Sequence, residues 1–243
     1  MIRPSAFSPF GYQAATFYAN LQFSAAKVLP KLQTEAAGEL DGEPVLLPNP
    51  DAPAFVPRLM LPSSDGSLRV EVSLQRLDVR WNRRPDASGP TLENFCRLSS
   101  RVFAAFDSTV ASRPGRLALI VQQFQIHTDP GRELATHFCR PELLSNEPQR
   151  KGPLNRPENF ELHAHKVFEL GPFRVNSWVR CKSGIIIEGQ TQQRVITVEN
   201  DLNTLAEELE TREFSEPEIS DFLSRARTEI DTIASVYFPE DQE

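Results

Sequence analysis

Residues 67–81 read SLRVEVSLQRLDVRW, residues 92–110 read LENFCRLSSRVFAAFDSTV, and residues 116–126 read RLALIVQQFQI. The first stretch alternates apolar and polar residues, which is typical of strands with one buried face. The second repeats apolar residues at steps of three and four, which predicts an amphipathic helix after the N-cap Thr91. The third is apolar on both faces over residues 117–121 and predicts a central strand.

Two turns are predicted around the first stretch. Asp65 followed by Gly66 is a strong hairpin signal, because glycine accepts a positive φ without steric cost. The apolar residues then occupy even positions up to Leu74 and odd positions from Leu77. Because a shift of one residue moves every side chain to the other face, we predict a tight turn or bulge just before Leu77.

The C-terminal segment combines negative charge with a helical repeat. Residues 201–243 contain thirteen acidic residues and three arginines. A free acidic tail would explain the charge, but apolar residues from Ile219 to Tyr237 recur at helical steps. Ser215 with Glu218 forms a capping box. We therefore predict a helix over residues 216–237 that packs on the sheet and directs its acidic face outward, where it would repel nucleic acid.

The rest of the chain supplies further strands and one further helix. The predicted strands are residues 14–23, 59–61, 160–168, 173–181, 185–187 and 194–198, the predicted helix is residues 25–37, and residues 129–131 are predicted to form a turn. Residues 146–159 are almost free of apolar side chains and predict a connecting segment.

The order of strands followed by a helix thus occurs twice. The expected fold class is α+β with two related halves, each an antiparallel sheet covered by an amphipathic helix. Residues 1–145 would form the N-terminal half, residues 146–159 the connector, and residues 160–243 the C-terminal half ending in the acidic helix. A chain of 243 residues can bury one large core or two small ones.

Composition predicts a soluble globular protein in a reducing compartment. The chain is 40% hydrophobic and 24% charged, which is too apolar for general disorder. No window reaches membrane-spanning length and no long apolar run follows the first residues, so the default expectation is a cytoplasmic location. Cys96, Cys139 and Cys181 are odd in number and widely spaced. We expect three free, buried or half-buried thiols rather than disulfides or a zinc site.

Common signatures of enzymes are absent from the sequence. Neither phosphate-binding loop pattern, GxxxxGK[ST] or GxGxxG, occurs, and there is no GxSxG turn for a nucleophilic serine. None of the five lysines follows an acidic residue by two positions, as some metal-dependent nucleases require. We therefore expect no cofactor and assign no catalytic residue.

Several of these stretches resemble a protein family. The run GSLRVEVSLQRLDVRWNRR, the helix and strand that follow it, and a closing helix after VITVEND resemble an uncharacterised family of sporadically distributed bacterial proteins of similar length. The resemblance covers residues 67–238 and is carried by hydrophobic and aromatic positions. It implies no activity, but the scattered distribution of that family implies a defence or mobile-element gene neighbourhood.

Two groups of residues have the chemistry of a metal or catalytic site. Glu161, His163 and His165 alternate on a predicted strand, so they share one face and could ligate zinc or another transition metal. A polar, half-exposed strand explains the same spacing, and a fourth ligand is not visible. His137 and Cys139 would share a face on an extended segment and could form a Cys/His dyad, whereas a helix would point them apart.

The densest basic cluster surrounds a tryptophan. Arg76, Arg80, Arg83 and Arg84 flank Trp81, and arginines beside an aromatic ring can bind single-stranded nucleic acid by stacking and phosphate contacts. Trp81 shares its parity with Leu77 and Val79, which instead predicts a core residue. The arginines would then decorate a strand beside acidic neighbours.

The function expected from these features is a binding or regulatory role without catalysis. The partner would be another protein or a second copy of the chain, and no membrane is involved. An uncharacterised hydrolase and a nucleic-acid-binding protein are the alternatives. A deep pocket with clustered titratable groups would favour the enzyme, and an exposed apolar patch would favour the binding protein.

Overall fold

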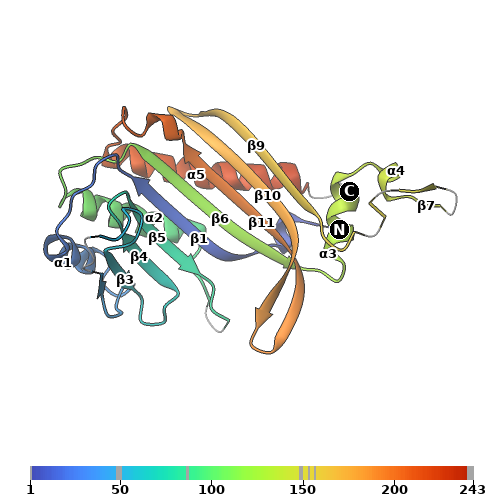
Figure 1. Ribbon diagram of the computed structural model, residues 1–243, viewed down its shortest axis with the longest axis horizontal. Coiled ribbons are helices and arrows are strands. Elements are labelled where there is room, and N and C mark those ends of the chain that lie inside the picture. The colour runs from blue at the N-terminus through green and yellow to red at the C-terminus, as the bar shows by residue number, and fades with distance from the viewer. Residues whose placement is uncertain are drawn as a thin grey trace.

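A computed structural model shows one antiparallel sheet of nine strands (Figure 1). The structure describes residues 2–47, 51–85, 88–147, 150–152, 154–155 and 157–239. The strands of the sheet are β1 (Ser8–Phe17), β2 (Val45–Leu46), β3 (Leu59–Pro62), β4 (Leu68–Val72), β5 (Arg76–Asn82), β6 (Arg116–Ile126), β9 (Glu161–Leu170), β10 (Phe173–Glu188) and β11 (Thr191–Thr204).

The strand order makes the sheet continuous. It runs β2-β3-β4-β5-β1-β6-β11-β10-β9, with every neighbouring pair antiparallel. β1 pairs with β5 on one side and with β6 on the other, so it joins the early strands to the late ones. The α+β class is confirmed, but the strands form one large sheet and not two separate ones.

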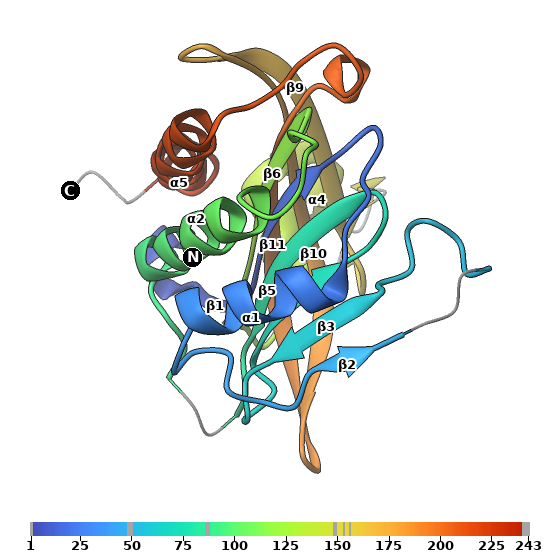
Figure 2. The same cartoon turned by 90° about the vertical axis from the view of Figure 1, so that its left-hand side faces the viewer.

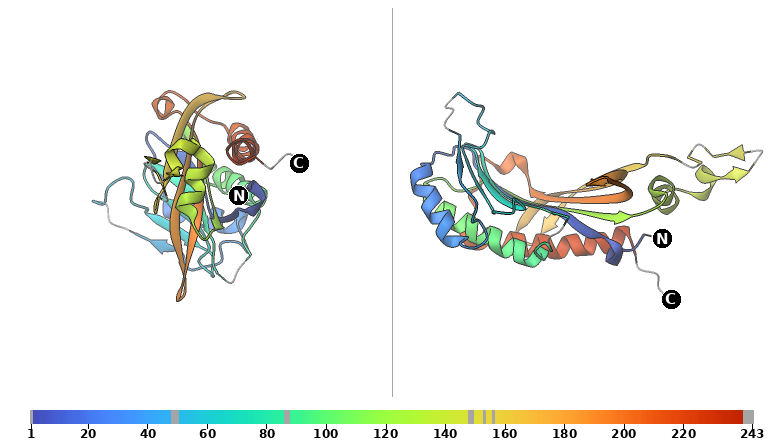
Figure 3. Two further views of the ribbon diagram at one scale, coloured as in Figure 1. Left: turned by 90° about the vertical axis from the view of Figure 1, so that its right-hand side faces the viewer. Right: turned by 90° about the horizontal axis from the view of Figure 1, so that it is seen from below.

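Three helices cover one face of this sheet. They are α1 (Ala25–Glu35), α2 (Leu92–Asp107) and α5 (Glu216–Tyr237), and they follow one another along the sheet (Figures 2 and 3). The Thr91 hydroxyl accepts a hydrogen bond from the Asn94 amide at the start of α2. The Ser215–Glu218 capping box is present at the start of α5, whose bounds match the predicted helix. Residues 216–237 of the acidic segment therefore form a helix that packs on the sheet.

The core lies between the helices and the covered face. The aromatic side chains of Phe95, Phe103, Phe106 and Phe222 are at most 1% exposed. Trp81 is 4% exposed and packs against Tyr12, with 5.0 Å between the ring centroids. Its prediction as a core residue is confirmed. A second, smaller hydrophobic cluster contains Ile2, Leu134, Ile196 and Phe238, at the end of the sheet where α5 ends.

The predicted turns lie where the sequence indicates them. Gly66 has a φ of +69° in the β3–β4 turn, which only glycine adopts readily. Between β4 and β5 the Ser73 amide donates to the Arg76 carbonyl across 2.9 Å. This tight turn causes the change of apolar parity before Leu77.

Two local predictions are wrong. The first strand is Ser8–Phe17 and not residues 14–23, because the chain leaves the sheet at Tyr18, whose buried hydroxyl bonds to Asp107. Residues 129–131 do not form an isolated turn, since Pro130 opens a helix, α3 (Pro130–Phe138). Proline suits the first turn of a helix, where its missing amide has no partner to lose.

The segment between β6 and β9 extends beyond the end of the sheet (Figure 1). It contains α3, the short helix α4 (Pro141–Leu144) and a separate hairpin of β7 (Asn146–Glu147) and β8 (Arg150–Lys151). The predicted connector, residues 146–159, includes this hairpin, and its residues 148–149, 153 and 156 lie outside the described part. Among the described residues, no helix has the length and hydropathy needed to cross a membrane.

Candidate interaction surfaces

The arginine cluster is divided between two places. Arg76 and Arg80 extend from β5 on the sheet face opposite α1, α2 and α5, here called the uncovered face, while Trp81 points to the face that these helices cover. The Arg83 guanidinium lies 5.1 Å from the Phe124 ring centroid. Arg84 lies beside the β3–β4 turn, near Gly66. The structure therefore brings together Arg76 and Arg80, but it does not combine all four arginines with Trp81.

Acidic side chains neutralise the arginines of β5. Arg76 Nε lies 2.7 Å from Asp78 Oδ2, and Arg80 lies 3.3 Å from Glu71 and 3.6 Å from Asp78. Asp78 is 2% exposed and accepts a further hydrogen bond from Gln13. Burial raises the Asp78 pKa, and the two guanidinium groups oppose that shift. This network weakens the attraction that a phosphate backbone would need.

The three candidate metal ligands share one face of β9, on the same uncovered side. His163 Nε2 lies 3.7 Å from Glu161 Oε2. His165 stacks on Trp178 with ring centroids 4.2 Å apart, and its Nε2 lies 3.1 Å from Asn176 Oδ1. His165 is thus held by neighbours on β10. Within the described residues, no three histidine, cysteine or acidic side chains are grouped as metal ligands.

The histidine and cysteine of the proposed dyad belong to the end of α3. His137 Nε2 lies 2.6 Å from the Tyr237 carbonyl oxygen, and its ring packs against Phe138 and Phe238. Cys139 is the residue that ends the helix and is half-buried. The imidazole therefore connects α3 to the end of α5, which is a structural role.

All three cysteines are free, as expected. Cys96 and Cys181 are buried, and burial raises the pKa of each thiol to about 12. Both remain protonated at neutral pH and have little nucleophilic character.

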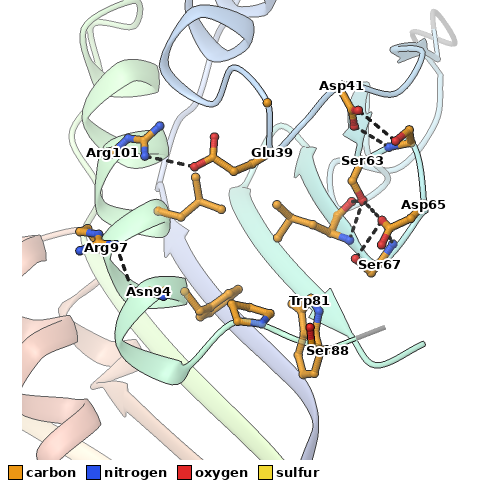
Figure 4. A pocket seen from close by; sticks show the side chains of 16 residues that line it. Glu39, Asp41, Ser63, Asp65, Ser67, Trp81, Ser88, Asn94, Arg97 and Arg101 are labelled. Atoms are coloured by element: carbon orange, nitrogen blue, oxygen red, sulfur yellow. Dashed lines mark hydrogen bonds and ion pairs between the residues drawn. The ribbon is translucent and has the colours of Figure 1, made fainter. Parts of the chain in front are cut away.

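A large pocket lies between α2, the loop after α1, and the β3–β4 turn (Figure 4). It has a volume of about 550 Å³. Arg97 and Arg101 lie on its helical wall, and Asp41 and Asp65 lie on the opposite wall. Trp81 lies at its base, so this tryptophan is a packing residue that also borders a cavity.

The carboxylates of this pocket hold its loops together. Asp41 accepts hydrogen bonds from the amide and hydroxyl of Ser64, at 2.7 and 2.9 Å. Asp65 accepts from the hydroxyl of Ser63 at 2.6 Å and from the amide of Ser67 at 2.9 Å. These bonds lower the pKa of both carboxyl groups. Neither group can act as a general acid near neutral pH.

A narrower groove runs between β9 and the last turns of α5. Its volume is about 380 Å³, and its apolar lining includes Phe168, Val179, Ile233 and Val236. Val236 is 72% exposed. The helical repeat of α5 predicts its apolar face but not the groove, because the groove depends on where the helix crosses the sheet.

The ends of β10 and β11 form a two-stranded ribbon that projects from the sheet (Figure 1). β6 pairs with β11 no further than Val195, and β9 pairs with β10 no further than Lys182. Residues 185–194, here called the ribbon, pair with each other, and the Arg194 carbonyl at the base of the ribbon accepts a hydrogen bond from the His127 amide across 3.0 Å. Ile185 and Ile187 lie on one face of the ribbon and are 61% and 67% exposed.

The chain matches no protein-family model and has no significant match among curated proteins.

Proposed function

We propose that this protein is a non-enzymatic binding component that contacts a protein partner through the ribbon. The observation that carries this proposal is the exposure of Ile185 and Ile187 on one face of a projecting hairpin. Large apolar side chains gathered at an exposed site are characteristic of interaction surfaces.

Docking would stabilise the ribbon as well as the complex. A two-stranded hairpin is marginally stable alone in water. Burial of apolar surface contributes about 25 cal/mol per Å², so covering both isoleucines would favour association. Their cross-strand neighbours, Arg194 and Gln192, are exposed and would supply a polar rim. This arrangement resembles a small interface with an apolar centre.

The other surfaces give little support to a catalytic or nucleic-acid-binding function. The Asp41 and Asp65 carboxylates are engaged by serines, and the Cys96 and Cys181 thiols are protonated. The β5 arginines are paired with acids. These carboxylates, thiols and arginines therefore have structural roles. Their engagement favours the protein-binding proposal over a hydrolase or a nucleic-acid-binding protein.

The strand order also supports two related halves within the one sheet. From the outside inward, the first set reads β3-β4-β5-β1 and the second reads β9-β10-β11-β6, with β1 and β6 paired at the middle. α2 follows β5 and α5 follows β11 in the chain. If the halves are related, β6 is the first strand of the second half.

Recovery of the tagged protein from its native host tests the functional proposal. The wild type and Leu46→Ser should each copurify with the same protein, because Leu46 is 52% exposed but lies on β2, at the opposite edge. The double variant Ile185→Ser, Ile187→Ser should lose that protein. Retention of the partner by the ribbon variant would contradict the proposal. The identity of the partner also tests the defence or mobile-element context.

A further inference from the structure

The strand β9 is an open edge of the sheet. Its inner side pairs with β10 through residues 161–170. In the described part of the chain, no strand pairs with its outer side, whereas the opposite edge ends in the two-residue strand β2. A long edge strand presents backbone donors and acceptors to any strand that approaches it. Val167, in its second half, is 42% exposed.

We propose that a second copy of the chain pairs with this edge, with the two β9 strands antiparallel about a two-fold axis at Val167. A symmetric dimer uses the same surface on both subunits. The axis must lie perpendicular to the sheet, because only then do the identical strands lie side by side and antiparallel. The uncovered faces of both copies then point to the same side.

Charge disfavours two central registers and is compatible with the axis at Val167. Under this symmetry an odd-numbered residue always faces an odd-numbered residue of the second copy, and an even-numbered residue faces an even-numbered one. The axis therefore lies midway between the two copies of one β9 residue. An axis at His165 would oppose Glu161 with Glu169, and an axis at Lys166 would oppose two lysines. An axis at Val167 opposes His165 with Glu169 and the two valines with each other. Like charges directly opposite destabilise a strand pair, whereas a polar pair such as histidine with glutamate and a pair of β-branched residues are tolerated or favourable.

The covered side of β9 agrees with this register. Lys166 lies 4.8 Å over the Phe168 ring of its own chain. In the dimer Lys166 faces Phe168 of the second copy, which adds a second aromatic contact for the ammonium group. The groove between β9 and α5 borders the same seam, so the exposed Val236 of each copy would turn toward the other subunit.

Substitutions at Val167 test both the interface and the register. Val167→Lys and Val167→Glu each place like charges on the axis and should weaken self-association by about tenfold or more. An equimolar mixture should restore a dimer, because lysine then faces glutamate. Val45→Lys is the control, since Val45 is 41% exposed on the opposite edge strand. Molar mass would be measured by light scattering after size exclusion.

The expected pattern is a dimer for wild type and Val45→Lys, a monomer for each Val167 variant alone, and a dimer for the mixture. Restoration in the mixture also shows that both variants fold. If either variant is misfolded by circular dichroism, Glu169→Lys replaces it, since this change removes the carboxylate opposite His165 and should also weaken the dimer. A monomeric wild type at the highest soluble concentration, or a dimer unaffected by these changes, would overturn the proposal.

Discussion

The Tyr18 hydroxyl donates a hydrogen bond to Asp107 Oδ1 across 2.8 Å, connecting the end of β1 to the last residue of α2. The Asp107 side chain is 3% exposed, and Arg113 lies 3.8 Å from its other oxygen. Burial raises the Asp107 pKa to about 6, against the stabilising effects of Tyr18 and Arg113 on the charged form. This carboxyl group therefore makes stability depend on pH.

Asp107→Asn should remove that dependence. The folded protein binds the Asp107 proton more tightly than the unfolded chain does. The protonated carboxyl group therefore contributes its full share of the unfolding free energy below the ordinary pKa of 3.8. This stabilisation is lost as the pH rises through about 6. Between those limits the wild type should lose about 2 to 3 kcal/mol of unfolding free energy relative to Asp107→Asn, in urea titrations. Parallel pH profiles of the two proteins would contradict the assignment.

Phe222→Ala should destabilise the protein strongly. Phe222 is 0% exposed and packs edge-on against Phe173, with 5.6 Å between ring centroids. Truncating a buried phenylalanine costs about 3 to 5 kcal/mol, which is a large part of a typical total stability of about 5 to 15 kcal/mol. Asp231→Asn on the exposed face should change stability by less than about 0.5 kcal/mol. Equal thermal midpoints for Phe222→Ala and wild type would show that α5 does not stabilise the core.

Local periodicity predicts much of this fold. α5 and the strand over residues 116–126 have the predicted bounds, because long, regular apolar patterns and a capping box specify them locally. β1 is displaced because its end depends on Tyr18 reaching Asp107, a contact across 89 residues. No local pattern contains such information.

The interaction surfaces are less predictable than the fold. The apolar run at Ile185–Ile187 predicts a strand, but its exposure depends on how far β6 and β9 extend beside it. The pocket beside α2 depends on Asp41 reaching Ser64 across 23 residues. Alternation did place Glu161, His163 and His165 on one face, yet it could not show that Trp178 stacks on one of them.

The wild-type protein should give no salt-sensitive gel shift with single-stranded DNA or RNA. Arg80 is paired with Glu71 and Asp78, so little unbalanced positive charge faces solvent there. The double variant Arg80→Glu, Arg83→Glu is the matched comparison. A shift that the wild type shows at low salt and this variant lacks would favour the nucleic-acid alternative.

Protein purified without an affinity tag should contain less than one equivalent of zinc, manganese or iron. His165 is held by Trp178 and Asn176, which leaves His163 and Glu161 as an incomplete set of ligands. Elemental analysis of the wild type and of His163→Ala, His165→Ala measures this directly. One tightly held equivalent that the double variant loses would identify a metal site on β9.

Hydrogen–deuterium exchange of the protein, alone and with its copurified partner, tests the binding proposal most directly. The partner should slow exchange of backbone amides in residues 185–194, because docking on Ile185 and Ile187 would suppress opening of a ribbon that is marginally stable by itself. Exchange around Arg76 and Arg80 should stay unchanged. Protection confined to β5, with a ribbon that exchanges equally fast in both samples, would contradict the proposed function.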